Sequence, residues 1–242
     1  MVRARRPYLH TIALCLAFVS TPMRSTAAEP ANIEGTWQIA AVQSAFKPEA
    51  GEVPFTDKGR QRYQENKRYL SKKDFNSYDY ATARCASPGL PRLMLTPERF
   101  RIWQRSGLTT FQFEWNRLFR QIDMGGLIPQ SRIVPDDELV GRAVPVSKGR
   151  WEGDTFVVST EGFPDNTLVD NLVPHGYDMK TTERIRLKSA DTLENRITIE
   201  DPEYFTRPWE TVITYKRQPD AAFSESVCLA RLPHLQKLTR NP

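Results

Sequence analysis

Long apolar runs are missing from this chain of 242 residues. No stretch reaches 18 apolar residues, which excludes a membrane-spanning helix from the mature protein. Histidine and cysteine are scarce, at three each, and their spacing suggests no zinc site. The sequence lacks a P-loop, a Rossmann fingerprint, a Gly-x-Ser-x-Gly elbow and an HExxH motif. Nucleotide, serine-hydrolase and zinc-protease functions therefore have no support, and we expect neither a metal nor a cofactor.

The first 28 residues have the three-part layout of a secretory signal peptide. They hold four arginines and no acidic residue, followed by the apolar stretch TIALCLAFV and a small-residue cleavage site. We therefore expect cleavage near Ala28, a periplasmic or secreted protein, and a single mature domain over residues 29–242. The motif RRPYL at 5–9 fits twin-arginine export as well as an ordinary basic leader.

The charge of the mature chain is nearly balanced. The full chain has 34 basic and 29 acidic residues, and loss of the four leader arginines leaves 30 against 29. No basic stripe interleaved with aromatic residues remains beyond residues 60–68, so we expect no nucleic-acid partner. We interpret the dense charge of 60–68 as a solvated helix face.

Two cysteines remain once Cys15 leaves with the leader. Cys85 and Cys228 are expected in an oxidising compartment, where a single pair predicts a disulfide. The bond would close a loop of more than 140 residues and contribute at most about 4–5 kcal/mol in the chain-entropy model.

Short segments with alternating apolar and polar residues fill most of the mature chain and predict strands. A tight hairpin turn is expected at 152–154, because Gly153 and Asp154 favour turn geometry. The expected strands cover residues 33–39, 99–103, 108–115, 118–122, 140–146, 150–151, 155–158, 182–188, 193–200, 211–217 and 223–230.

Helix-forming composition is concentrated in residues 57–73, whose sparse apolar stripe predicts a surface helix. Residues 74–97 are expected to form an ordered loop. So many strands with so little helix predict a mainly β fold. We expect an antiparallel meander closed into a lipocalin-like barrel or a strongly curved sheet, because closure removes exposed edges.

Two resemblances accompany this pattern. Gly35-Thr36-Trp37 on the first strand resembles the Gly-x-Trp start of lipocalins and related barrels, which implies that Trp37 closes the barrel base. Most of residues 33–230 resembles an exported bacterial "GRWEGDT" family, which implies a single exported domain and no particular reaction. Lys180 stands where that family has a second histidine, so a two-histidine site is not predicted. The motifs are FEWN at 113–116, GRWEGDT at 149–155, TEGF at 160–163 and YFTRPW at 204–209.

His175 is the natural proton carrier of the chain, in a Pro/Gly-containing loop between expected strands. A carboxylate that orients it, from Asp178 or Glu183, would make it a general acid or base. The alternative is a polar surface loop with a solvated histidine.

Four further residues are candidate ligand-binding groups. Glu114 interrupts an aromatic strand, and Arg120 on the next strand could pair with it as a polar anchor inside a barrel. If that face points outward, the two are an ordinary exposed pair. Arg207, with Tyr204 nearby, could bind a carboxylate or belong to a structural stack.

These residues support two main functions and a third alternative. The first is an exported protein that holds a small, partly apolar ligand in a barrel cavity. The second is a cofactor-free lyase, isomerase or hydrolase that uses His175. A structural or envelope-interaction protein is the third. The binding protein ranks first, because one loop histidine without a nucleophile is weak support for chemistry. The sequence does not indicate the oligomeric state.

Overall fold

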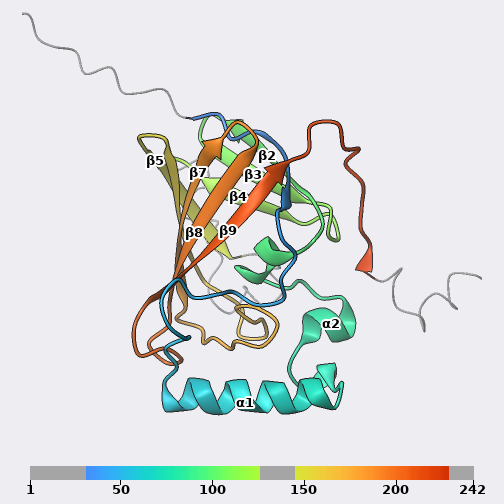
Figure 1. The fold of residues 1–242 in the computed structure, drawn as a ribbon, viewed down its shortest axis with the longest axis vertical. Helices are drawn as coiled ribbons and strands as arrows, with labels where there is room; N and C mark the ends of the chain where they lie inside the picture. The colour runs from blue at the N-terminus through green and yellow to red at the C-terminus, as the bar shows by residue number, and fades with distance from the viewer. Residues whose placement is uncertain (1–30, 126–144, 229–242) are drawn as a thin grey trace, which may run out of the picture.

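A computed structural model describes residues 31–125 and 145–228 of the chain. The expected leader lies outside these residues. In the described ranges the chain forms one closed β-barrel, with a helix across one end (Figure 1). The described part contains no helix that is both long and apolar enough to span a membrane.

The barrel confirms the predicted mainly β fold. The order of the strands around the barrel follows the chain, and the last strand pairs with the first. The described strands are β1 (Gly35–Ile39), β2 (Phe100–Arg105), β3 (Leu108–Phe113), β4 (Phe119–Asp123), β5 (Val146–Glu152), β6 (Thr155–Glu161), β7 (Lys180–Ser189), β8 (Thr192–Glu200) and β9 (Trp209–Arg217).

One strand pair departs from the predicted antiparallel meander. β4 and β5 run parallel, with Ile122 opposite Ser147 and Asp123 opposite Lys148. A parallel pair requires a connection that returns the chain to the same end of the sheet, which a tight turn cannot do. Most of the expected strand 140–146 lies outside the described residues.

The interior of the barrel is filled by one face of each strand. On β8, for example, Leu193, Ile197 and Ile199 are buried, as the period of two predicts. The residues packed in this way are largely aromatic and branched. They include Trp37, Phe100, Ile102, Phe111, Phe113, Ile122, Phe156, Val158, Ile185, Ile213 and Tyr215.

Trp37 is fully buried beside the seam between β1 and β9. Its indole N–H donates to the Ile33 carbonyl at 3.0 Å, and the Arg217 guanidinium lies 4.2 Å from the ring centroid. Gly35 has φ +129°, and a Cβ there would collide with the Arg217 side chain. The Gly-x-Trp triplet therefore places an arginine over the tryptophan and has a packing role.

The predicted hairpin and surface helix are both confirmed. Glu152 pairs with Thr155, so Gly153 and Asp154 form the turn between β5 and β6, and Gly153 has φ +62°. Helix α1 (Asp57–Ser71) begins after Thr56, whose hydroxyl accepts from the Gly59 amide at 3.1 Å. The loop expected at 74–97 also contains α2 (Tyr80–Arg84) and the short 3₁₀ turns η1 (Phe75–Ser77) and η2 (Arg92–Leu95).

The described part of the expected last strand, 223–230, is irregular and makes only one bridge, between Ser226 and Trp115.

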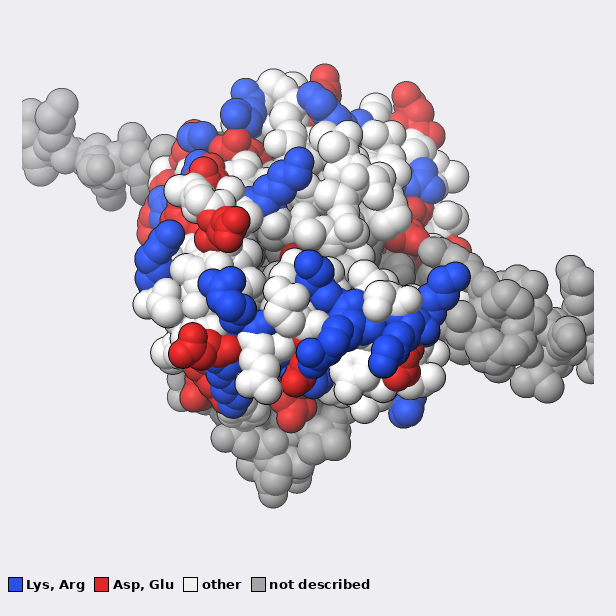
Figure 2. Space-filling view, turned by 60° about the horizontal axis from the view of Figure 1, so that its bottom comes forward, with Lys and Arg blue, Asp and Glu red and all other residues white. Residues whose placement is uncertain are grey.

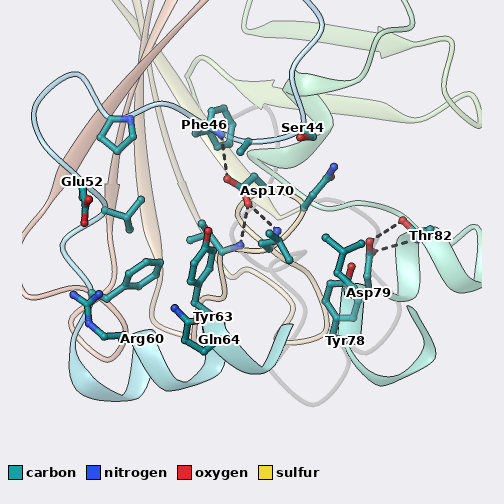
Figure 3. Close-up of a pocket in the computed structure, with 18 of the residues that line it drawn as sticks. Ser44, Phe46, Glu52, Arg60, Tyr63, Gln64, Tyr78, Asp79, Thr82 and Asp170 are labelled. Atoms are coloured by element: carbon teal, nitrogen blue, oxygen red, sulfur yellow. Dashed lines mark hydrogen bonds between the residues drawn. The ribbon is translucent and has the colours of Figure 1, made fainter. Parts of the chain in front are cut away.

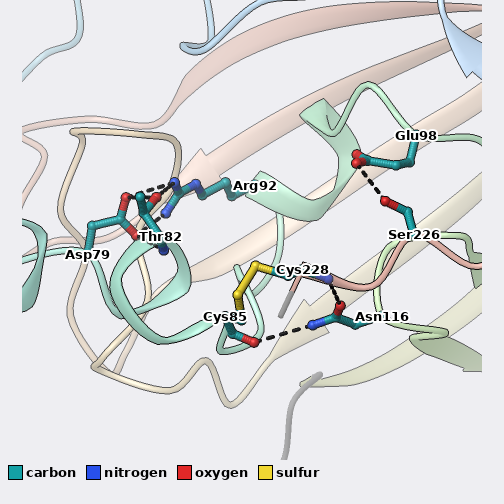
Figure 4. The surroundings of a disulfide bond; sticks show 8 residues. All are labelled: Asp79, Thr82, Cys85, Arg92, Glu98, Asn116, Ser226 and Cys228. Atoms are coloured by element: carbon teal, nitrogen blue, oxygen red, sulfur yellow. Dashed lines mark hydrogen bonds and ion pairs between the residues drawn. A yellow bond between two sulfur atoms is a disulfide. The ribbon is translucent and has the colours of Figure 1, made fainter. Parts of the chain in front are cut away.

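The predicted disulfide is confirmed: Cys85 and Cys228 are bonded, with their Cα atoms 5.5 Å apart (Figure 4). Asn116 donates to the Cys85 carbonyl and accepts from the Cys228 amide. The segment after β9 is therefore held as a strap by side-chain contacts and by the disulfide.

Candidate functional site

A cavity of about 540 Å³ lies between the end of the barrel and α1 (Figure 3). Four segments form its walls: residues 44–55, α1, residues 75–82 and the loop 170–173. A second cavity, of about 510 Å³, lies beside it, toward Trp115 and Cys228. We refer to the first as the end cavity.

Aromatic rings form much of the wall of the end cavity. Phe55 stacks on Tyr63 of α1, with ring centroids 5.0 Å apart, and Phe75 stacks on Tyr78 at 6.2 Å. Phe46 is buried on the side toward the barrel. Such walls offer apolar contact to a guest, as in most small-molecule sites.

Asp170 is a buried carboxylate in the wall of the end cavity. Its oxygens accept from the amides of Phe46 at 3.0 Å and of Leu172 and Val173 at 2.9 Å (Figure 3). Burial raises the pKa of Asp170, and the three amide bonds act in the opposite direction. These bonds fasten the segment around Phe46 to the 170–173 loop, so Asp170 shapes the wall.

A second buried carboxylate, Asp79, is paired with Arg92. The guanidinium donates to both carboxylate oxygens, at 2.7 and 2.9 Å, and its Nε donates to Asn171 at 3.0 Å. Burial acts to raise the pKa of Asp79, but the Arg92 bonds outweigh it and the pKa is lowered. Asp79 lines the end cavity and Arg92 lines the second cavity. Their neighbours Thr82 and Asn171 line both, so the Asp79–Arg92 ion pair lies in the wall that separates the two cavities.

The predicted residues Arg120 and Glu183 meet inside the barrel. Arg120 Nη2 forms an ion pair with Glu183 Oε2 and donates to the Thr160 hydroxyl at 3.0 Å. Its Nε donates to Ser147 at 3.2 Å, and Asn195 donates to Glu183 Oε1 at 2.8 Å. We call these five residues the lumen cluster; all are buried.

The lumen cluster includes polar atoms that lack a partner among the described residues: Arg120 Nη1 and Asn195 Oδ1. The hydroxyl of Thr211, on β9, lacks one as well. Such a buried donor and acceptor could form hydrogen bonds with a small polar molecule, such as water. The lumen cluster lines neither of the two cavities described above.

The expected pairing of Glu114 with Arg120 is wrong. Glu114 lies just beyond the end of β3, where Arg99 donates to it from Nε at 3.0 Å and pairs from Nη2 at 2.7 Å. The Ser224 amide donates to it at 2.8 Å. Burial acts to raise the pKa of Glu114, but the bonds from Arg99 and Ser224 lower it. Glu114 thus fastens the strap that follows β9.

His175 is buried in the loop between β6 and β7, not solvated. Its Nδ1 donates to the Gly176 carbonyl at 2.8 Å, and its Nε2 lies 2.9 Å from the Thr167 hydroxyl. Burial lowers the pKa of His175, while the Gly176 bond and nearby acids oppose it in part. The expected orienting groups are elsewhere: Asp178 is exposed, and Glu183 belongs to the lumen cluster.

Tyr204 and Arg207 also lie apart from the lumen cluster and line neither of the two described cavities. The Tyr204 ring is half-buried, with Lys58 Nζ 5.4 Å from its centroid. Arg207 is exposed and donates to the Pro208 carbonyl at 3.4 Å. Among the described residues, no group of three His, Cys, Asp or Glu is placed to hold a metal ion.

Sequence reasoning missed Asp79 and Arg92, because both lie in a segment without periodicity. Their one local signal is the N-cap position of Asp79 before α2, where its carboxylate accepts from the Thr82 amide at 3.2 Å. No family model, curated protein or solved structure matches the chain.

Proposed function

We propose that the protein is an exported binding protein that holds a small, partly apolar molecule in the end cavity. The observation that carries this proposal is the cavity itself: about 540 Å³, lined in part by Phe46, Phe55, Tyr63, Phe75 and Tyr78. Drug-sized ligands occupy pockets of about 300–1,000 Å³ that have mostly apolar walls. The disulfide and the leader support export, and membership of the "GRWEGDT" family is part of the same proposal.

From the sequence we expect the ligand inside the barrel; we now propose that it binds at the end of the barrel. The lumen is packed with aromatic and branched side chains. The end cavity is lined in part by residues of α1, a helix with many exposed positions. His175 lines neither described cavity, and both of its ring nitrogens have partners. These contacts favour a structural histidine over the enzymatic alternative.

The test uses N-phenyl-1-naphthylamine, a neutral apolar probe whose fluorescence rises in an apolar site. Two substitutions fill the end cavity from opposite walls, Ala45→Trp and Gln64→Trp, at exposed positions that tolerate a larger side chain. The matched control is Ala190→Trp, in the exposed turn between β7 and β8. We expect both cavity variants to lose at least about tenfold in affinity, and the control to bind like the wild type.

Unchanged binding by both cavity variants would place the probe elsewhere and overturn the proposal. Absence of probe binding by the folded wild type would overturn it as well. Mass spectrometry of small molecules released from protein purified after export identifies a natural guest. Its release must be diminished from the Ala45→Trp variant.

A further inference from the structure

The charges around the end cavity indicate which kind of molecule it accepts. Its two buried carboxylates offer little attraction to a cation, because both already have strong donors. Asp79 is paired with Arg92, and Asp170 accepts from three backbone amides. A cationic guest would therefore compete with bonds that the protein has already formed.

The basic residues of α1 divide into two groups. Lys58 is paired with Glu203, and Arg62 and Arg68 are both paired with Glu65. The remaining two, Arg60 and Lys67, form no ion pair with any described residue. Lys58, Arg62 and Arg68 thus have acidic partners within the protein, with Glu65 shared by the two arginines, whereas Arg60 and Lys67 are available to a ligand.

Arg60 and Lys67 share the side of α1 that faces the end cavity. They are seven residues apart, close to two helical turns, so they project in nearly the same direction. Arg60 lines the cavity, and Lys67 Nζ lies 5.8 Å from the ring centroid of Tyr63, another lining residue. Gln64 and Leu70, on either side of Lys67 around the helix, line it too.

Acidic residues without an ion pair among the described residues also lie near these two cations: Glu52 and the buried Asp170 line the cavity, and Asp57 lies in the first turn of α1. Glu52 lines the cavity, is exposed, and forms no ion pair with a described residue. Arg60 and Lys67 thus present two cations without an acidic partner among the described residues on the cavity side of α1. Figure 2 shows Lys and Arg side chains gathered on the face turned forward from the bottom of Figure 1, where α1 lies.

From this placement we infer that the end cavity accepts small organic anions with an apolar body. The carboxylate, sulfonate or phosphate group lies at the mouth beside Arg60 and Lys67, and the body lies against Tyr63 and the neighbouring aromatic rings. This inference rests on the proposed function, because it specifies the ligand class of the same cavity.

Three probes of matched size and different charge test the inference. 2-Naphthylacetate is an anion, 2-naphthylethanol is neutral, and 2-naphthylethylamine is a cation. Calorimetric titration of the mature protein at low salt is expected to rank them in that order. Exposed charge contacts are weak, so the anion should bind about threefold to tenfold more tightly than the alcohol. Added salt should reduce this advantage.

The decisive variant is Arg60→Gln/Lys67→Gln, which should abolish the preference for the anion over the alcohol. The matched control is Lys72→Gln/Lys73→Gln, which removes the same charge just beyond α1, from exposed residues that do not line the cavity. The control should keep the preference.

Each contrary result has a distinct meaning. Equal binding of the three probes overturns the inference and leaves the proposed function standing. Loss of the preference in the control as well reveals a general charge effect and overturns the role of Arg60 and Lys67. If none of the probes binds, and N-phenyl-1-naphthylamine also fails to bind, the proposed function itself fails.

Discussion

Arg120 and Glu183 are an ion pair removed from water inside a barrel whose other contents are mostly apolar. Burying two charges costs more than their attraction returns, unless further hydrogen bonds satisfy both groups. Ser147, Thr160 and Asn195 supply those bonds, yet Arg120 Nη1 still lacks a partner among the described residues. The stability of the barrel therefore depends on the pair remaining complete.

Removal of one member should be costly. Arg120→Met leaves Glu183 buried without its cation, so we expect the free energy of unfolding to fall by about 3–5 kcal/mol. The double variant Arg120→Met/Glu183→Leu removes both charges and should recover at least about 2 kcal/mol of that loss. Urea denaturation of the single and double variants measures both values. A loss below about 1 kcal/mol for Arg120→Met would contradict the role given to the pair.

His175 should make the stability of the fold fall as the pH falls. Its pKa is lowered by burial from the ordinary value of 6.5, so the folded state favours the neutral ring. The contribution to stability is therefore complete above the unfolded pKa and is lost as the pH falls from there toward the lower folded pKa.

We expect the unfolding free energy of the wild type to decline more steeply than that of His175→Gln between about pH 7.5 and 5.5. Urea titrations of both proteins across this range measure the difference. Imidazole resonances provide a direct check, because the His175 signals should titrate below 6.5. Titration at or above that value would refute the prediction.

The sequence identifies the charged side chains that could belong to a site, but it does not identify their partners. Arg120 is a candidate as a possible partner of Glu114, and Glu183 as a carboxylate that could orient His175. Arg120 and Glu183 are 63 residues apart in the chain, and only the closure of the barrel brings β4 and β7 to a common interior. Glu114 is closer to Arg120 in sequence, yet it lies past the end of β3 and pairs with Arg99.

Among the elements, α1 shapes the end cavity, and its position depends on Gly59. A Cβ at Gly59 would collide with the Tyr204 carbonyl oxygen in the 201–206 loop and would lie 3.1 Å from Phe55. The backbone of α1 can approach this loop only because residue 59 has no side chain. Phe55 and α1 both line the end cavity, so the same contact sets its width.

Gly59→Ala should push α1 away from the barrel end. We expect a loss of about 1–3 kcal/mol of stability from overpacking, even though alanine favours helix. The affinity for N-phenyl-1-naphthylamine should fall at the same time. Gln61→Ala, at an exposed position of the same helix, is the control and should stay within about 0.5 kcal/mol of the wild type. Equal behaviour of the two variants would disprove the role of Gly59.

The strand and helix pattern could be predicted because period-two alternation and helix-forming composition are local properties. Strand direction was not predictable at β4 and β5, because it depends on the path of the connection between them. The irregular segment 223–228 has a strand-like composition. Its contacts are mostly with side chains, including those of Glu114, Asn116, Arg117 and Glu98, and it makes a single bridge at Ser226, so it does not extend the sheet.

For the whole molecule, the strap after β9 connects the barrel to the helical side of the protein. Its amides at Ser224 and Cys228 donate to Glu114 and Asn116, and its disulfide reaches Cys85 at the end of α2. Trp115 and Cys228 both line the second cavity, so the strap forms part of that wall too. The bond joins residues 143 apart, which greatly restricts the unfolded chain.

Loss of this bond should lower the stability of the whole domain. We expect Cys85→Ser/Cys228→Ser to reduce the free energy of unfolding by about 2–5 kcal/mol. Reductant should have a similar effect on the wild type and none on the double variant, which serves as the control. Urea midpoints with and without reductant measure this. Because the chain-entropy effect acts on the unfolded state, the variant should keep the barrel spectrum and the probe affinity of the folded protein. Matching midpoints for the oxidised and reduced wild type would contradict the expected stabilisation by the disulfide.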